Sequence, residues 1–279
     1  MKEKKVPIKT IHLFRPLDKM LIRLLKSLTA EQWEASTVAK RWTVKDIAAH
    51  LLDTNIRTIS ILRDGYFGDK PANIASYQDL VDYLNKLNHS WTDASRRLSP
   101  PLLIELLEKT GRQFHKELKA LPPYEPAVFP VAWAGQDQSP NWFHIAREYT
   151  EKFVHQQQIR DAVGSQALLT KKMYRPFLDS FMQALPYSYR NTMAEIGTVV
   201  TVIVKTKAGG RWNIIKDSGG WQLIKKIKQS PAAIVRIEPD IAWKLFSKSV
   251  APADVTGLVE IEGNQALGKV ALGMVSVMA

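Results

Sequence analysis

Two stretches of the sequence place histidines and carboxylates where a helix would bring them together. Glu151 and His155 are four residues apart, and His144 and Glu148 fall within the same narrow arc at about 100° per residue. A carboxylate and an imidazole one turn apart can hold a divalent cation, although this spacing also occurs on exposed helices that bind nothing. A third ligand from a neighbouring helix would leave one coordination position open, as in catalytic zinc sites. The second stretch surrounds His50, which could also be a hydrogen-bonded core histidine.

The chain contains no cysteine among its 279 residues. Structural disulfides, thiolate-ligated zinc, cysteine-held iron–sulfur clusters and a cysteine nucleophile are therefore excluded. Any transition-metal site must be built from His, Asp and Glu side chains. The absence of cysteine also fits a reducing compartment, so we expect a cytoplasmic protein.

Four further polar residues are candidates for orienting the ligands or contacting a substrate. Asp46 lies one turn before His50 and could orient it, but an acidic residue in the first turn of a helix is the preferred interpretation. Arg57 lies seven residues after His50 on a similar face. It could bind a substrate carboxylate or form a surface ion pair. His144 and Glu148 could be extra ligands or support the ligands, and Glu148 could instead face solvent.

The elements that carry these residues are helical through the first half of the chain. Apolar residues recur at helical spacing, and Thr29 and Thr43 resemble N-caps. We expect helices over residues 14–28, 44–64, 77–98 and 102–121, and a fifth long helix that starts at Asn141 or Ser139 and runs to residue 163. A short helix carrying Trp33 is expected after Thr29, and a further helix over 168–185. The Pro- and Gly-rich segment between the fourth and fifth long helices is predicted to be an ordered loop.

The sequence changes character near residue 195. Segments rich in β-branched residues predict five strands, over 197–206, 211–217, 221–227, 232–238 and 257–263. Short helices are expected over 239–248 and 264–276. We predict a helical domain over residues 1–165, a linker helix over 166–194 and a smaller α+β domain over 195–279.

The chain is basic, with 39 Lys and Arg against 27 Asp and Glu and a formal net charge of +12. Such a balance is compatible with nucleic-acid binding, and basic residues crowd the first strands of the C-terminal domain. No known nucleic-acid-binding motif accompanies them, so we expect a solvated cationic surface and no nucleic-acid partner. We also expect no membrane partner, because no run of about 18 apolar residues exists, and no secretory signal follows the charged N-terminus.

Two segments of the helical half resemble the DinB-like superfamily, in particular the N-terminal domain of mycothiol-dependent maleylpyruvate isomerases. They are LTAEQWEASTVAKRWTVKDIAAHLLD and REYTEKFVHQQQIRDA. The resemblance implies a four-helix bundle that binds a divalent metal, usually zinc or nickel. Its ligands are a histidine after the W-T-V-x-D helix start and a later Glu-x-x-x-His pair, which correspond to His50, Glu151 and His155. The segments VRIEPDIAWKLFSK and GLVEIEGNQALGKVALGMVSV resemble the small sterol-carrier-like domain that often follows this bundle.

The resemblance implies a metal-dependent enzyme that acts as a low-molecular-weight-thiol-dependent S-transferase or isomerase on a small electrophilic substrate. Zinc is the favoured metal, and nickel is the other candidate. Such an enzyme needs no cysteine, because the sulfur arrives with the cosubstrate. The maleylpyruvate isomerases recruit an arginine from the C-terminal domain, whereas this chain has no arginine after Arg236. We therefore expect the broader class rather than that specific isomerase reaction.

The alternative function is non-catalytic. The protein would then bind a metal, or an apolar ligand between the sheet and the helices of the sterol-carrier-like domain. The same apolar residues would also serve as a packed core without a cavity. The identity of the thiol and of the electrophile, and the oligomeric state, stay open at this point.

Overall fold

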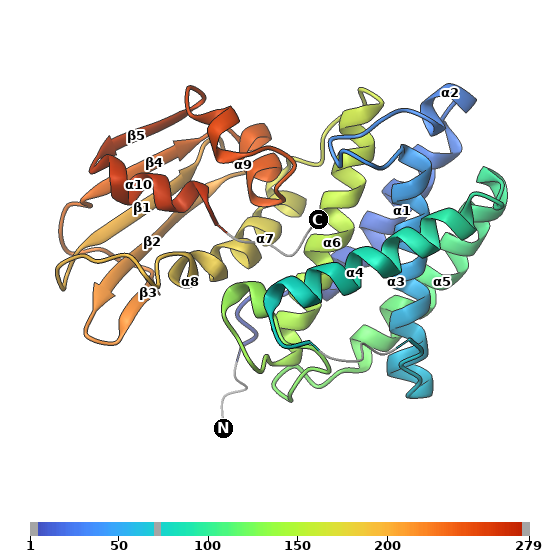
Figure 1. Cartoon of the computed structure of the whole chain (residues 1–279), viewed down its shortest axis with the longest axis horizontal. Coiled ribbons are helices and arrows are strands. Elements are labelled where there is room, and N and C mark those ends of the chain that lie inside the picture. Colours follow the sequence, from blue (N-terminus) through green and yellow to red (C-terminus); the bar gives the residue numbers. More distant parts are fainter. Residues whose placement is uncertain (1–4, 70–73, 275–279) are drawn as a thin grey trace. The chain divides into compact units, whose positions relative to one another are not determined.

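A computed structural model describes residues 5–69 and 74–274 of the chain (Figure 1). Contacts between residues group into two compact units. One unit, called the helical unit below, contains residues 10–123 and 151–167. The other, called the sheet unit, contains residues 5–9, 124–150 and 168–274. The domain boundaries expected at residues 165 and 195 stay a prediction.

Long amphipathic helices build the helical unit. They are α1 (Phe14–Lys26), α3 (Val44–Asp64), α4 (Tyr77–Ser95), α5 (Pro100–Ala120) and the second half of α6 (Asn141–Ala162), with the short η1 (Ile11–Leu13) and α2 (Ala30–Trp33). Helix α3 packs along α5 and α4, and α1 packs along α5. Their apolar faces form one core that includes Leu25, Ile47, Leu51 and Leu103. Each such side chain stabilises the fold by roughly 1.5–3 kcal/mol relative to leaving it exposed, so packing holds the helices together.

Capping residues determine where these helices begin. The side chains of Thr29, Thr43 and Ser76 each accept a hydrogen bond from the backbone N–H of the residue three positions later. The side chain of that later residue accepts a hydrogen bond from the backbone N–H of the capping residue. The starts predicted at Thr29 and Thr43 are therefore confirmed. The helix expected over 102–121 instead begins at Pro100, because a proline in the first turn lacks only an N–H that the helix leaves unpaired.

Helix α6 is buried on nearly every side. Its polar side chains are buried together with its apolar ones, and they include Lys152, Gln156, Gln157 and Gln158. Lys152 Nζ lies 3.1 Å from the Asp18 carboxylate of α1. Buried polar groups must find partners inside the protein, and the ion pair with Asp18 supplies one for Lys152 and joins α6 to α1.

The described part of the sheet unit contains one five-stranded sheet in the order β3-β2-β1-β4-β5. The strands are β1 (Val199–Val204), β2 (Gly210–Asp217), β3 (Gly220–Ile224), β4 (Ala233–Ile237) and β5 (Val259–Gly263). Strands β1 and β4 are parallel, and all other neighbours are antiparallel. The predicted combination of a helical region with a C-terminal α+β region is confirmed.

Helices of the sheet unit cover this sheet with a packed aromatic core. They are α7 (Lys171–Phe181), α8 (Leu185–Ser188), α9 (Pro239–Phe246) and α10 (Gln265–Leu272), with η2 (Ala132–Ala134), η3 (Met182–Ala184) and η4 (Pro252–Val255). Helix α10 packs on β1, β4 and β5, and α8 packs on β3. The largest fully buried side chains include Tyr174, Phe177, Phe181, Tyr189, Trp243 and Phe246.

Residues 275 and 276 of the helix expected over 264–276 lie outside the described residues. Across the described ranges, no helix is long and apolar enough to cross a membrane.

Candidate metal centre

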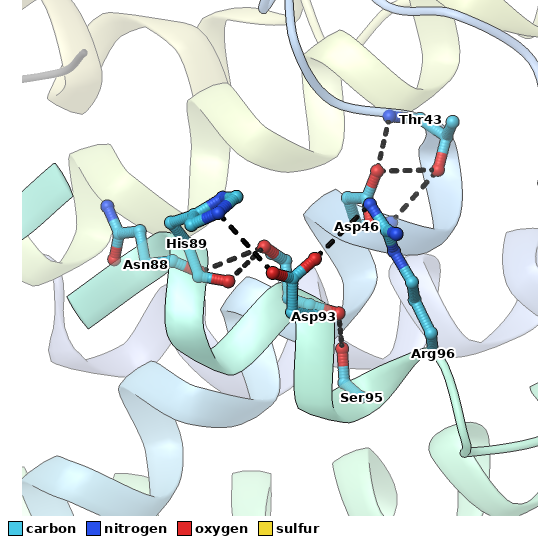
Figure 2. A network of polar contacts seen from close by, with 8 residues as sticks. Thr43, Asp46, Asn88, His89, Asp93, Ser95 and Arg96 are labelled. Carbon is cyan, nitrogen blue, oxygen red and sulfur yellow. Dashed lines mark hydrogen bonds and ion pairs between the residues drawn. The ribbon is translucent and has the colours of Figure 1, made fainter. Parts of the chain in front are cut away.

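The start of α3 places His50 relative to the rest of the unit. Thr43 donates from its backbone N and its Oγ1 to the Asp46 carboxylate, each at 3.0 Å, and Asp46 N donates back to Thr43 Oγ1 at 3.2 Å (Figure 2). Asp46 is therefore engaged in the helix cap, which agrees with the preferred sequence interpretation. Its contribution to the site is to fix the first turn of α3.

Helix α4 is fastened to the same part of α3. Lys45 Nζ donates to the backbone oxygen of Arg96 at 3.1 Å, and Asp93 pairs with both Arg96 and His89 (Figure 2). One turn further on, Trp91 Nε1 donates to Ala49 O at 2.8 Å, directly before His50 in the chain. The bonds of Lys45 and Ala49 hold the first two turns of α3 against α4 and the residue that follows it, and they limit the freedom of the His50 backbone.

Three side chains of the helical unit meet between α3 and α6. His50, Glu151 and His155 each offer one ligand atom, and these atoms all lie within 4.8 Å of one another. His155 Nε2 is 3.5 Å from Glu151 Oε2, as their spacing of one turn predicts. Both histidines are buried, at 8% and 4% exposure, whereas Glu151 is half-buried. The structure thus brings together the three residues that the family resemblance implied.

The environment of His50 keeps its ring neutral. Burial lowers the pKa of His50 well below its ordinary value, and the neighbouring His155 and the Arg57 guanidinium lower it further. The Asn88 side chain beside the ring acts in the opposite direction and raises the pKa of His50, but burial outweighs it. A neutral imidazole is the form that binds a metal, because its unprotonated nitrogen carries a free lone pair.

The second histidine has its tautomer set by a neighbour. His155 Nδ1 lies 2.9 Å from the amide oxygen of Gln158, one turn further along α6. An amide oxygen only accepts, so Nδ1 carries the proton and Nε2, the atom facing Glu151, keeps its lone pair. Gln158 was not among the site residues predicted from the sequence. Its spacing of three residues from His155 is the signal that could have pointed to it.

The donor set fits a divalent transition metal. Two imidazoles and one carboxylate are common ligands of zinc, and three protein ligands leave a position for water or substrate. Ligand atoms around a tetrahedral zinc with bonds of about 2.0 Å are about 3.3 Å apart. The 3.5 Å between His155 and Glu151 is close to this value.

Trp42 forms one wall of the cluster. Its ring centroid is 4.8 Å from that of His50 and 5.9 Å from that of His155. Trp42 directly precedes the cap residue Thr43, so the same bonds that start α3 also place this indole. An aromatic wall excludes water from one side of the cluster.

Arg57 lies beyond His50 on α3 and pairs with a buried carboxylate. Its Nε is 2.8 Å from Asp53 Oδ2, and its side chain is 36% exposed. Burial raises the pKa of Asp53, while the Arg57 charge acts in the opposite direction. Arg57 is therefore held in a fixed position near the cluster and still reaches solvent.

His144 and Glu148 form a separate network in the sheet unit. Arg147 donates to His144 Nδ1 at 2.8 Å and to Glu148 Oε1 at 2.7 Å. Burial, aided by Arg147, lowers the pKa of His144 to about 4. Within the described residues, the candidate metal cluster does not include either side chain.

Comparison with known proteins identifies the family of the chain. Residues 14–160, more than half of the chain, match the family described as Mycothiol maleylpyruvate isomerase N-terminal domain. The chain belongs to this family. All three residues of the cluster lie within the matched segment, so this member of the mycothiol maleylpyruvate isomerase N-terminal domain family carries its candidate metal centre in the family domain.

Solved structures extend the likeness to most of the chain. A crystal structure of a histidine-to-alanine mutant of the mycothiol-dependent maleylpyruvate isomerase matches with a TM-score of 0.52 and 11% identity, over 90% of this chain and 91% of that chain. A second structure of the isomerase matches with a TM-score of 0.51 and 11% identity, over 86% and 88%. At this identity the likeness concerns the fold. The sterol carrier protein domain 2 of Helicoverpa armigera covers 37% of this chain and 92% of its own, with 18% identity and a TM-score of 0.28. None of the curated proteins matches the sequence.

Proposed function

We propose that the protein is a metal-dependent enzyme, a thiol-dependent S-transferase or isomerase that acts on a small electrophile. The observation that carries the proposal is the meeting of His50, Glu151 and His155, with ligand atoms within 4.8 Å of one another, inside the family domain. Two imidazoles and one carboxylate would hold a divalent cation, with zinc favoured and nickel the other candidate.

The chain's own residues prepare this site for a thiol cosubstrate. A divalent cation held there would lower the pKa of a coordinated thiol and make the sulfur nucleophilic. The protein has no cysteine, so a sulfur nucleophile must come from a small molecule. The name of the similar isomerase, mycothiol-dependent, supports a low-molecular-weight thiol in this role. Trp42 and the buried histidines would shield a thiol bound there partly from water.

Arg57 is the proposed contact for the electrophile. Asp53 fixes its Nε, and its exposure leaves the guanidinium accessible from outside. A guanidinium binds a carboxylate with two parallel hydrogen bonds, which would orient an acidic substrate toward the cluster. The ion pair with Asp53 alone would give Arg57 a purely structural role, and kinetics with acidic and neutral electrophiles distinguish the two.

Metal analysis tests the proposal directly. Wild-type protein, His155→Ala and the control His89→Ala are purified without a tag and measured by plasma mass spectrometry after incubation with zinc or nickel. His89 is a suitable control because it is an exposed histidine that also pairs with a carboxylate four residues away. We expect near-stoichiometric metal in the wild type and in His89→Ala, and loss in His155→Ala. Absence of metal from the wild type would refute the proposal, and metal without thiol transfer to any electrophile would favour the non-catalytic alternative.

A further inference from the structure

Three consecutive glutamines follow His155 on α6, and all three are buried. Gln156, Gln157 and Gln158 are 0%, 2% and 3% exposed. Consecutive helical residues point about 100° apart, so these amides face three different directions. Each buried amide requires hydrogen-bond partners to offset its desolvation.

Gln156 and Gln158 have different hydrogen-bond partners. With its nitrogen toward α1, the Gln156 amide donates to Leu17 O at 3.2 Å and accepts from Leu21 N at 2.7 Å. It therefore ties α6 to the backbone of α1. Gln158 places its amide oxygen 2.9 Å from His155 Nδ1, on the side of the ring away from the atom that faces Glu151.

We propose that Gln158 is a positioning residue of the metal centre, which selects the His155 tautomer with a free Nε2 and holds the ring against rotation. This inference rests on the proposed function. A neutral imidazole in solution exchanges between two tautomers and turns freely about its side-chain bonds. The bond from Nδ1 removes both freedoms before a metal arrives, so less order has to be created on binding.

The choice of an amide also determines the charge of the site. A carboxylate at this position would add a second negative charge beside the one on Glu151. With glutamine, Glu151 is the only anion among the cluster and this orienting partner, so a bound divalent cation would keep a net positive charge. That balance favours a further anionic ligand such as a thiolate.

The test measures metal affinity and the tautomer of His155 in separate experiments. Zinc dissociation constants are obtained by competition with a chromophoric chelator for the wild type, Gln158→Leu, Gln158→Glu and the matched control Gln156→Leu. We expect Gln158→Leu to bind zinc roughly 10–100-fold more weakly, as is typical for the loss of such a partner. Gln158→Glu keeps an acceptor of the same shape and should bind at least as tightly as the wild type. Gln156→Leu should lose thermal stability but keep its zinc affinity.

Long-range proton–nitrogen NMR correlations of metal-free protein report the tautomer directly. We expect the Nδ1–H form of His155 in the wild type and in Gln156→Leu, and a mixture in Gln158→Leu. Equal zinc affinity of the wild type and Gln158→Leu would overturn the inference alone. Wild-type protein that binds no zinc would overturn the proposed function as well. If Gln158→Leu does not fold, weaker zinc binding by Gln158→Glu would overturn the inference.

Discussion

The imidazole rings of His50 and His155 meet edge to face, with centroids 4.7 Å apart and planes inclined at 70°. They come from α3 and α6, and His155 is one of the neighbours that lower the pKa of His50, after burial itself. Together with the Glu151 carboxylate, the two buried rings form the ligand set of the candidate metal centre.

Zinc should stabilise the folded protein, by an amount that grows with the logarithm of its concentration relative to the dissociation constant. A ligand that binds only the native state at 100 times its dissociation constant adds about 2.7 kcal/mol to the free energy of unfolding. Urea unfolding with and without zinc measures this gain. Glu151→Gln keeps the size of the side chain but removes its charge, so the gain should shrink strongly in this variant. An equal gain in Glu151→Gln would place the stabilising zinc elsewhere.

Asp46→Ala should weaken the fold without removing the metal. The carboxylate accepts two bonds from Thr43, and loss of a capping interaction costs about 1 kcal/mol. Asp79→Ala is the matched control, because Asp79 has the same position in the capping box of α4. Unfolding free energies of both variants should fall by similar amounts, and metal content should stay unchanged. Loss of metal in Asp46→Ala but not in Asp79→Ala would assign Asp46 a direct supporting role at the site.

The sequence predicted the local structure of α3 and α6 well, because capping residues and apolar periodicity are encoded within a few neighbouring residues. It placed Glu151 and His155 on one face of α6 but left open whether further polar residues of this helix share their site. His144 and Glu148 lie in the same angular arc as His155, but a rise of 1.5 Å per residue separates His144 from it by about 16 Å along the axis. The partner His50 came from the family resemblance, since periodicity within one helix carries no information about which helix lies opposite.

Arg57→Lys should impair the use of acidic electrophiles while metal binding stays intact. Lysine keeps the charge but cannot form two parallel bonds to a carboxylate. Hydrogen bonds to charged groups contribute about 1.5–3 kcal/mol, so we expect KM for a carboxylated electrophile to rise about 10–100-fold. KM for a neutral electrophile should change little. Equal effects on both substrates would show that Arg57 acts only through its ion pair with Asp53.

Acid should destabilise the fold partly through His144. Its pKa is about 4 in the folded protein, below its ordinary value of 6.5, so the unfolded chain binds the proton more readily. The stabilising contribution of the neutral ring is therefore complete above pH 6.5 and is lost as the pH falls from there toward 4. Between pH 7.5 and 5 the loss is about 2 kcal/mol for this shift. Urea unfolding at pH 7.5 and at pH 5 measures the decrease in the free energy of unfolding. In His144→Asn, which cannot titrate, this decrease should be smaller by about 2 kcal/mol. Replacing the exposed His89 should leave the decrease unchanged. An identical decrease in His144→Asn would show that other groups account for the acid sensitivity.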